Sequence, residues 1–206
     1  MIETVYLLRH GHVDNGGEKR YLGKTDITLD ALGKEQAHAL HDYFKDIPID
    51  MVFTSPLKRC LQTAQLLCAG KKRHCQCVEA FSEIDMGDWE NMAMSDIKMR
   101  YPKLYKQRGE DLEYFTPPNG ENFHAMAKRV RDAFNVITHH ATGTILIVAH
   151  AGVNRMILAS ILGIAINDMF SIAQPYACIN KLVLGDNEQW RGISVGEELT
   201  STNFRE

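Results

Sequence analysis

Residues 144–149 have the sequence TILIVA, an almost unbroken apolar run. A run of this length without polar alternation predicts a strand covered on both faces, as in a parallel sheet between two helical layers. Further apolar runs at residues 5–8, 51–53 and 178–184 predict three more strands. These strands restrict the chain to the α/β class, in which amphipathic helices fill the intervals.

The intervals carry apolar side chains at helical spacing. Four helices are predicted: from Asp30 to before Pro48, from Ser55-Pro56 to Gly70, from Asn119 or Gly120 through Ile137, and from Gly152 to Gly163. Asp30 and Ser55 have N-cap side chains, and Pro56 suits the first position of a helix. Residues 95–118 are interrupted by prolines and are expected to form an insertion over one end of the sheet.

The overall charge and composition exclude several classes of protein. The formal charge is −3 over 206 residues, with no basic stripe, which argues against non-specific nucleic-acid binding. No apolar run approaches the roughly 20 residues of a membrane span, and the first residues lack the basic start of a secretory signal. The five cysteines contain no CxxC pair and are read as reduced thiols. We therefore expect one cytoplasmic domain covering residues 1–206, and no metal site.

Two of the predicted strands end in similar sequences. LLRHGH places His10 directly after the first strand, and LIVAHAGV places His150 directly after the strongest one. Ligands of open α/β sheets bind beyond the carboxyl ends of the strands. We therefore expect the two imidazoles to meet in one crevice, although a lone histidine at a strand end is more often structural.

An arginine follows the predicted strand at residues 51–53. In VFTSPLKR, Arg59 falls in the first turn of the next helix, where the helix dipole disfavours a cation. A bound anion would explain it, because guanidinium groups such as those of Arg9 and Arg59 form bidentate pairs with phosphate. The alternative is an arginine solvated on the flank of the helix.

Taken in order, five motifs resemble those of the histidine phosphatase superfamily. They are LLRHG, TSPLKRCLQTA, EIDMGDWEN, PPNGENF and IVAHAGV, spread over residues 4 to about 155. The resemblance implies a three-layer α/β/α sandwich with a mixed, mainly parallel sheet and a small insertion over the active site. It also implies a metal-independent phosphatase that needs no cofactor and forms a covalent phosphohistidine.

The same resemblance assigns roles to individual residues. It implies His10 as nucleophile, Arg9 and Arg59 as phosphate ligands, His150 as the second pocket histidine, and Glu83 as the proton donor. Spacing alone does not distinguish Glu83 from its acidic neighbours, which are Glu79, Asp85, Asp88 and Glu90. Further substrate contacts are expected from Asn15, Tyr21, Gly23 and Gly152. Val13 and Gly16 stand where the family often has Thr and Asn, which puts secondary phosphate contacts in question.

Three functions remain open from the sequence. The first is a phosphomonoester hydrolase for a small phosphorylated metabolite, and α-ribazole 5′-phosphate is the candidate, because QPYACIN resembles that branch of the family. The second is a phosphoglycerate mutase, which the short spacing of 38 positions between Glu83 and Glu121 and the short polar tail disfavour. The third is a catalytically silent phosphate-binding relative. The oligomeric state cannot be read from the sequence.

Overall fold

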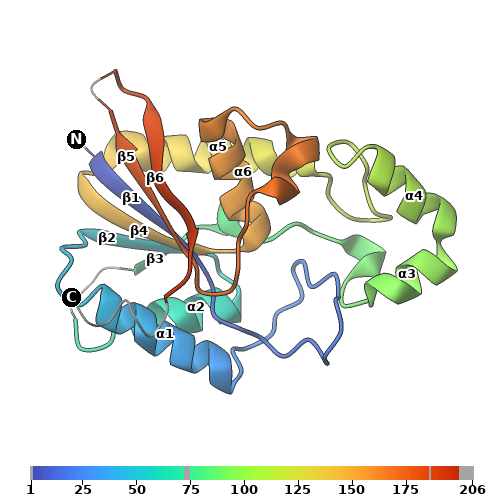
Figure 1. The fold of residues 1–206 in the computed structure, drawn as a ribbon, viewed down its shortest axis with the longest axis horizontal. Coiled ribbons are helices and arrows are strands. Elements are labelled where there is room, and N and C mark those ends of the chain that lie inside the picture. Colours follow the sequence, from blue (N-terminus) through green and yellow to red (C-terminus); the bar gives the residue numbers. More distant parts are fainter. Residues whose placement is uncertain (1, 72–74, 186, 200–206) are drawn as a thin grey trace.

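In a computed structural model, which describes residues 2–71, 75–185 and 187–199, one six-stranded sheet runs through the protein (Figure 1). Its spatial order is β3-β2-β4-β1-β5-β6. The strands are β1 (Ile2–Arg9), β2 (Met51–Thr54), β3 (Cys75–Cys77), β4 (Gly143–Ala149), β5 (Ile179–Leu184) and β6 (Trp190–Glu197). The first four are parallel to one another, whereas β5 is antiparallel to β1 and β6 is antiparallel to β5. The predicted α/β class with a mixed, mainly parallel sheet is confirmed.

Helices cover both faces of this sheet. The helices are α1 (Ala31–Tyr43), α2 (Lys58–Leu67), α3 (Met94–Arg100), α4 (Pro102–Glu110), α5 (Phe123–His140) and α6 (Ala151–Leu162). Figure 1 shows α1 and α2 together below the sheet and α5 and α6 together above it. The three-layer arrangement is therefore confirmed. None of the helices in the described ranges combines the length and the apolar character needed to cross a membrane.

The side chains of β1 alternate between the two layers. Val5 and Leu7 belong to the larger apolar cluster under α5 and α6. Tyr6 and Leu8 belong to the cluster under α1 and α2. All four are almost completely buried, because successive side chains of a strand point to opposite faces and both faces are covered here. The same burial fixes the register of the central strands, and this register sets the positions of the residues that follow them.

Two helix starts differ from the sequence prediction. Helix α2 begins at Lys58 rather than at Ser55-Pro56, and its first amide donates to Asp26 from a distant loop, at 2.7 Å. The Ser55 hydroxyl contacts His150 instead of capping the helix. Helix α5 begins at Phe123 with Asn122 as its N-cap, so Asn119 and Gly120 lie before it. Several side chains near a helix start, such as Asn119 and Asn122, are chemically able to act as its N-cap. Local spacing in the sequence does not show which of them does so.

The edge strands β3 and β6 were not predicted from the sequence. β3 has only three residues, all exposed, so it has no apolar signal. β6 is mostly solvent-facing, and irregularities interrupt its pairing with β5. Edge strands of this kind are defined by their neighbour's backbone rather than by their own side chains.

The insertion forms α3 and α4, which lie beyond the carboxyl ends of the parallel strands (Figure 1). Pro102 occupies the first turn of α4, where its missing N–H costs nothing. The base of the insertion is tied to the loop at residues 16–24 by backbone bonds between Tyr21 and residues Asn91 and Met92. Completely buried Trp89 lies between the rings of Tyr21 and Phe115, tilted against both, and anchors the contact. These two segments form the outer walls of the site.

Candidate active site

The sheet register brings the ends of β1 and β4 side by side. Arg9 pairs with Ala149, and the amide of His10 donates to the Ala149 carbonyl at 3.0 Å. The imidazoles of His10 and His150 therefore meet edge to face, with ring centroids 5.2 Å apart. Residues 140 positions apart in the chain thus form one cluster, as expected from the two matching strand ends.

His10 is held as a neutral imidazole with a defined tautomer. Its Nδ1 lies 2.7 Å from the carbonyl oxygen of Gly11, and a carbonyl can only accept a hydrogen bond. Nδ1 therefore carries the proton, which leaves a lone pair on Nε2. Burial, followed by the charges of Arg59 and Arg9, holds the pKa of His10 well below its ordinary value. His10 consequently offers an unprotonated nitrogen at neutral pH, which is what a nucleophile requires.

Arg59 is the most completely buried cation of the site, with 1% of its surface exposed. Its Nη1 and Nη2 donate to the carbonyl oxygens of Thr25 and Gly23, both at 2.7 Å. Its Nε donates to Nδ1 of His150 at 3.2 Å. These three bonds fix the guanidinium plane and leave two of its five N–H bonds for an anion. Among the residues that the structure describes, no carboxylate forms an ion pair with Arg59, and its role as an anion ligand stays a prediction.

His150 is completely buried, and both of its ring nitrogens already have partners. Because Nδ1 accepts from Arg59, the proton must lie on Nε2, which is 2.8 Å from the Ser55 hydroxyl. Burial, with the charge of Arg59 next, holds its pKa well below the ordinary value. His150 stands behind His10 and Arg59 and is not part of the pocket wall. Since Nε2–H is the only donor of this neutral ring, direct contact with a phosphate oxygen would require its hydrogen bond to Ser55 to be exchanged.

Arg9 is oriented by residues that the sequence analysis did not select. Its guanidinium carbon lies 3.6 Å from the centre of the Tyr176 ring, and Nη1 donates to the Gln174 carbonyl at 2.6 Å. The Tyr176 ring also touches the imidazole of His10, at a centroid distance of 5.6 Å. Stacking on an aromatic face fixes the orientation of the planar guanidinium without neutralising its charge. The motif QPYACIN contains both supporting residues, although no role followed from its pattern.

Of the acidic candidates in residues 79–90, only Glu83 lines the pocket. Its Oε2 accepts from the amide of Gly152 at 3.0 Å, and its Oε1 accepts from the amide of Ile84. The carboxylate is thereby held at the start of α6, close to the strand-end cluster. Glu79 instead accepts from Ser82, and Asp88 accepts from Asn119. The tertiary structure thus makes a distinction that spacing could not make.

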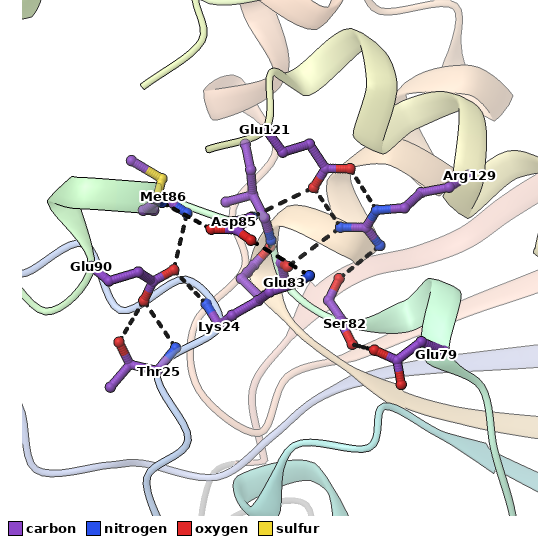
Figure 2. A network of polar contacts seen from close by, with 12 residues as sticks. Lys24, Thr25, Glu79, Ser82, Glu83, Asp85, Met86, Glu90, Glu121 and Arg129 are labelled. Atoms are coloured by element: carbon purple, nitrogen blue, oxygen red, sulfur yellow. Dashed lines mark hydrogen bonds and ion pairs between the residues drawn. The ribbon is translucent and has the colours of Figure 1, made fainter. Parts of the chain in front are cut away.

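Arg129 fastens the segment that carries Glu83 (Figure 2). Its Nη1 donates to the carbonyls of Ala80 and Ser82 at 2.7 and 2.9 Å, and its Nη2 reaches that of Glu83 at 3.3 Å. A bidentate pair with Glu121, at 2.7 and 2.8 Å, fixes the guanidinium in turn. Helix α5 therefore determines the position of the candidate acid, a role that sequence spacing did not reveal.

Glu90 connects the two walls of the pocket (Figure 2). Its carboxylate accepts from the amides of Lys24, Thr25 and Met86, at 2.8 to 2.9 Å, and from the Thr25 hydroxyl. The same loop supplies the Thr25 carbonyl that holds Arg59. One half-buried carboxylate thus links the loop that holds Arg59 to the loop that carries Glu83.

The pocket itself has a volume of about 300 Å³ and contains all four predicted substrate contacts, which are Asn15, Tyr21, Gly23 and Gly152. Two of these glycines also hold site residues in place. The Gly23 carbonyl accepts from Arg59, and the Gly152 amide donates to Glu83. A Cβ on Gly23 would lie 2.1 Å from Oε1 of Glu90, so only glycine fits there. In the described part of the chain, no three His, Cys, Asp or Glu side chains form a group able to hold a metal ion.

A neutral imidazole between two guanidinium groups, with a carboxylate nearby, is an arrangement suited to phosphoryl transfer. A sequence model of the histidine phosphatase superfamily (branch 1) matches residues 5–196. The chain belongs to this superfamily, as its motifs implied.

Similar proteins support the same assignment. The chain is 29% identical to an adenosylcobalamin/alpha-ribazole phosphatase of Escherichia coli, over 84% of this chain and 86% of that protein. It is 32% identical to an uncharacterized phosphatase, PhoE, of Bacillus subtilis, over 91% of each. The crystal structure of a putative alpha-ribazole-5′-P phosphatase from Escherichia coli superposes with a TM-score of 0.88 at 25% identity. That superposition covers 96% of this chain and 97% of the other.

Proposed function

We propose that this protein hydrolyses a small phosphomonoester through a covalent phosphohistidine on His10. The observation that carries the proposal is the free Nε2 lone pair of His10, on a buried neutral ring beside Arg9 and Arg59. Nucleophilic catalysis divides one difficult displacement into two easier ones. The named phosphatases among the relatives support hydrolysis as the outcome.

In the first step, Nε2 of His10 attacks phosphorus and the bond from phosphorus to the ester oxygen breaks. Arg9 and Arg59 stabilise the charge on the non-bridging oxygens of the phosphoryl group. The protonated carboxyl of Glu83 gives its proton to the departing alkoxide, which is a poor leaving group without one. The products are the free alcohol and phosphohistidine.

In the second step, water attacks the phosphohistidine. Glu83, now a carboxylate, takes a proton from the water as the new oxygen–phosphorus bond forms and the nitrogen–phosphorus bond breaks. Inorganic phosphate leaves, and His10 regains its lone pair. His150 acts in this scheme by orienting Arg59, to which it is hydrogen-bonded.

We infer that residues 1–206 form a single catalytic domain, since strands from both ends of the described chain share one sheet. A cytoplasmic location is proposed from the cysteine pattern of the sequence, in which five cysteines include no CxxC pair. α-Ribazole 5′-phosphate is the first substrate to test, because relatives carry that activity in their names. Phosphoglycerate mutase is the second candidate function, and the phosphatase relatives make it the weaker one.

The proposal is tested by rapid quenching after mixing with a radiolabelled phosphomonoester, without added metal and with a chelator present. We expect acid-labile, base-stable phosphate on the wild-type protein and on His38→Gln, an exposed control on α1. His10→Ala should carry no label and lose turnover. Turnover by His10→Ala would overturn the mechanism. Conversion of 3-phosphoglycerate to 2-phosphoglycerate without phosphate release would show a mutase instead.

A further inference from the structure

The pocket carries more positive charge than one phosphate needs. Six cationic side chains line it, against the single carboxylate of Glu83; they are Arg9, Lys19, Arg20, Arg59, Arg108 and Arg155. This concentration is local, because the chain as a whole has a formal charge of −3. A cleft of one sign of charge concentrates and orients ligands of the opposite sign.

Three of these cations already have a proposed role or a charged partner. Arg9 and Arg59 flank His10 and match the two charges of a phosphate dianion. Arg20 pairs with Glu18 and donates to the carbonyls of Asn15 and Asn91, so it closes a loop. Among the described residues, Lys19, Arg108 and Arg155 make no ion pair. Lys19 is exposed, and Arg108 lies over the Tyr21 ring, 5.2 Å from its centre. Arg155 differs from these two because it interacts electrostatically with Arg9 and Glu83 and is held by a hydrogen bond from its Nε to the Ile172 carbonyl at 3.0 Å.

The position of Arg155 is energetically unfavourable for a guanidinium group that has no bound anion. It stands on α6, one turn after His150, and is partly buried. Burial, followed by the positive charge of Arg9, lowers the pKa of Arg155, although the carboxylate of Glu83 partly compensates. Holding two arginines close together at partial burial costs free energy unless an anion offsets their repulsion.

The surroundings of Arg155 indicate what kind of group would reach it. Its guanidinium carbon lies 5.2 Å from the centre of the Phe170 ring, and that ring meets Phe123 edge to face at 6.4 Å. Met169 completes this side of the pocket wall. The part of the pocket wall around Arg155 is thus apolar and aromatic, with this one cation set into it. Such a wall suits an organic body that itself bears a negative charge.

We propose that Arg155 binds a second anionic group, a carboxylate or a second phosphate, on the organic part of the phosphomonoester substrate. The inference rests on the proposed phosphatase function and refines its substrate class. Arg155 is a specificity residue in this view, while the chemistry stays with His10 and Glu83. α-Ribazole 5′-phosphate, whose phosphate is its only anionic group, would gain nothing from this contact.

Three aryl phosphates of similar shape test the inference: 4-carboxyphenyl phosphate, its neutral isostere 4-carbamoylphenyl phosphate, and 1,4-phenylene bisphosphate. We expect wild-type kcat/KM to be about tenfold higher for the better of the two anionic substrates than for the neutral one. Arg155→Gln should remove this preference. Arg131→Gln on the exposed face of α5 removes the same charge away from the pocket and should keep it. The relative order of carboxylate and bisphosphate identifies the second anion.

The measured quantity is the kcat/KM for an anionic substrate divided by the kcat/KM for the neutral one. Comparing this ratio between the wild type and a variant cancels the intrinsic difference in leaving-group reactivity. Equal losses on all three substrates in Arg155→Gln would mean that Arg155 serves the transferred phosphate, and the inference would fail. A wild-type enzyme without any preference also overturns it, whether or not the variant folds. Hydrolysis of all three at similar rates would leave the proposed phosphatase function intact, whereas hydrolysis of none would count against that function.

Discussion

The carboxylate of Glu83 and the backbone amide of Gly152 are joined by a 3.0 Å hydrogen bond between residues 69 positions apart. This contact joins the loop after β3 to the first turn of α6. It also explains why the position after Ala151 is a glycine. A Cβ built on Gly152 would lie 2.2 Å from Oε1 of Glu83, far inside van der Waals contact.

The first prediction concerns that glycine. Gly152→Ala should displace the Glu83 carboxylate and lower kcat by about 100-fold, since a misplacement of about 1 Å has effects of that size. Gly109→Ala is the matched control, because nothing lies within 4 Å of its Cβ position on α4. Steady-state kinetics and thermal melts of both variants provide the test. A fully active Gly152→Ala would show that the position of Glu83 is unimportant.

A second prediction separates the acid role of Glu83 from a structural one. Glu83→Gln should reduce the first step about 100-fold or more for alkyl phosphates, whose leaving groups require a proton. The burst of nitrophenolate from 4-nitrophenyl phosphate should persist, because that leaving group departs without protonation. Glu79→Gln, outside the pocket, should behave as wild type. Equal losses with both kinds of substrate would contradict general acid catalysis by Glu83.

Glu90 is predicted to act as a positioning residue. Glu90→Gln puts an amide NH₂ against backbone donors that now bind the carboxylate, so the loop holding Arg59 should shift. We expect kcat/KM to fall about tenfold or more, mainly through KM for phosphate esters and Ki for inorganic phosphate. Glu110→Gln, which removes an exposed helix carboxylate, serves as control. If phosphate inhibition is unchanged in Glu90→Gln, Glu90 does not orient Arg59.

The last prediction concerns stability and pH. Burial holds the pKa of His150 well below its ordinary 6.5, so below pH 6.5 the unfolded chain binds a proton that the folded chain does not. The free energy of unfolding should therefore fall with falling pH, by about 1.4 kcal/mol per pH unit for each such imidazole. His150→Gln should reduce this slope in urea titrations between pH 7.5 and 5.5. His38→Gln reports the contribution of an exposed histidine, and identical slopes in His150→Gln and wild type would refute the prediction.

Local patterns in the sequence were sufficient for the interior of the fold. The apolar runs of β1, β2 and β4 and the helical spacing of α1, α5 and α6 follow from burial on both faces of a sheet, which leaves a periodic record in the chain. The positions of His10, Arg59 and His150 at element ends follow from the same patterns. The strands β3 and β6 bury little of their own and leave no such record, so they were missed.

What only the tertiary structure decided is how side chains meet across the sheet. The choice of Glu83 over Glu90 depends on which carboxylate lines the pocket, because both of them accept from backbone amides. The engagement of His150 with Arg59, the stacking of Tyr176 on Arg9 and the unpaired charge of Arg155 likewise join distant segments. Such contacts depend on distances between elements, and a single sequence records periodicity within an element but not the spacing between elements.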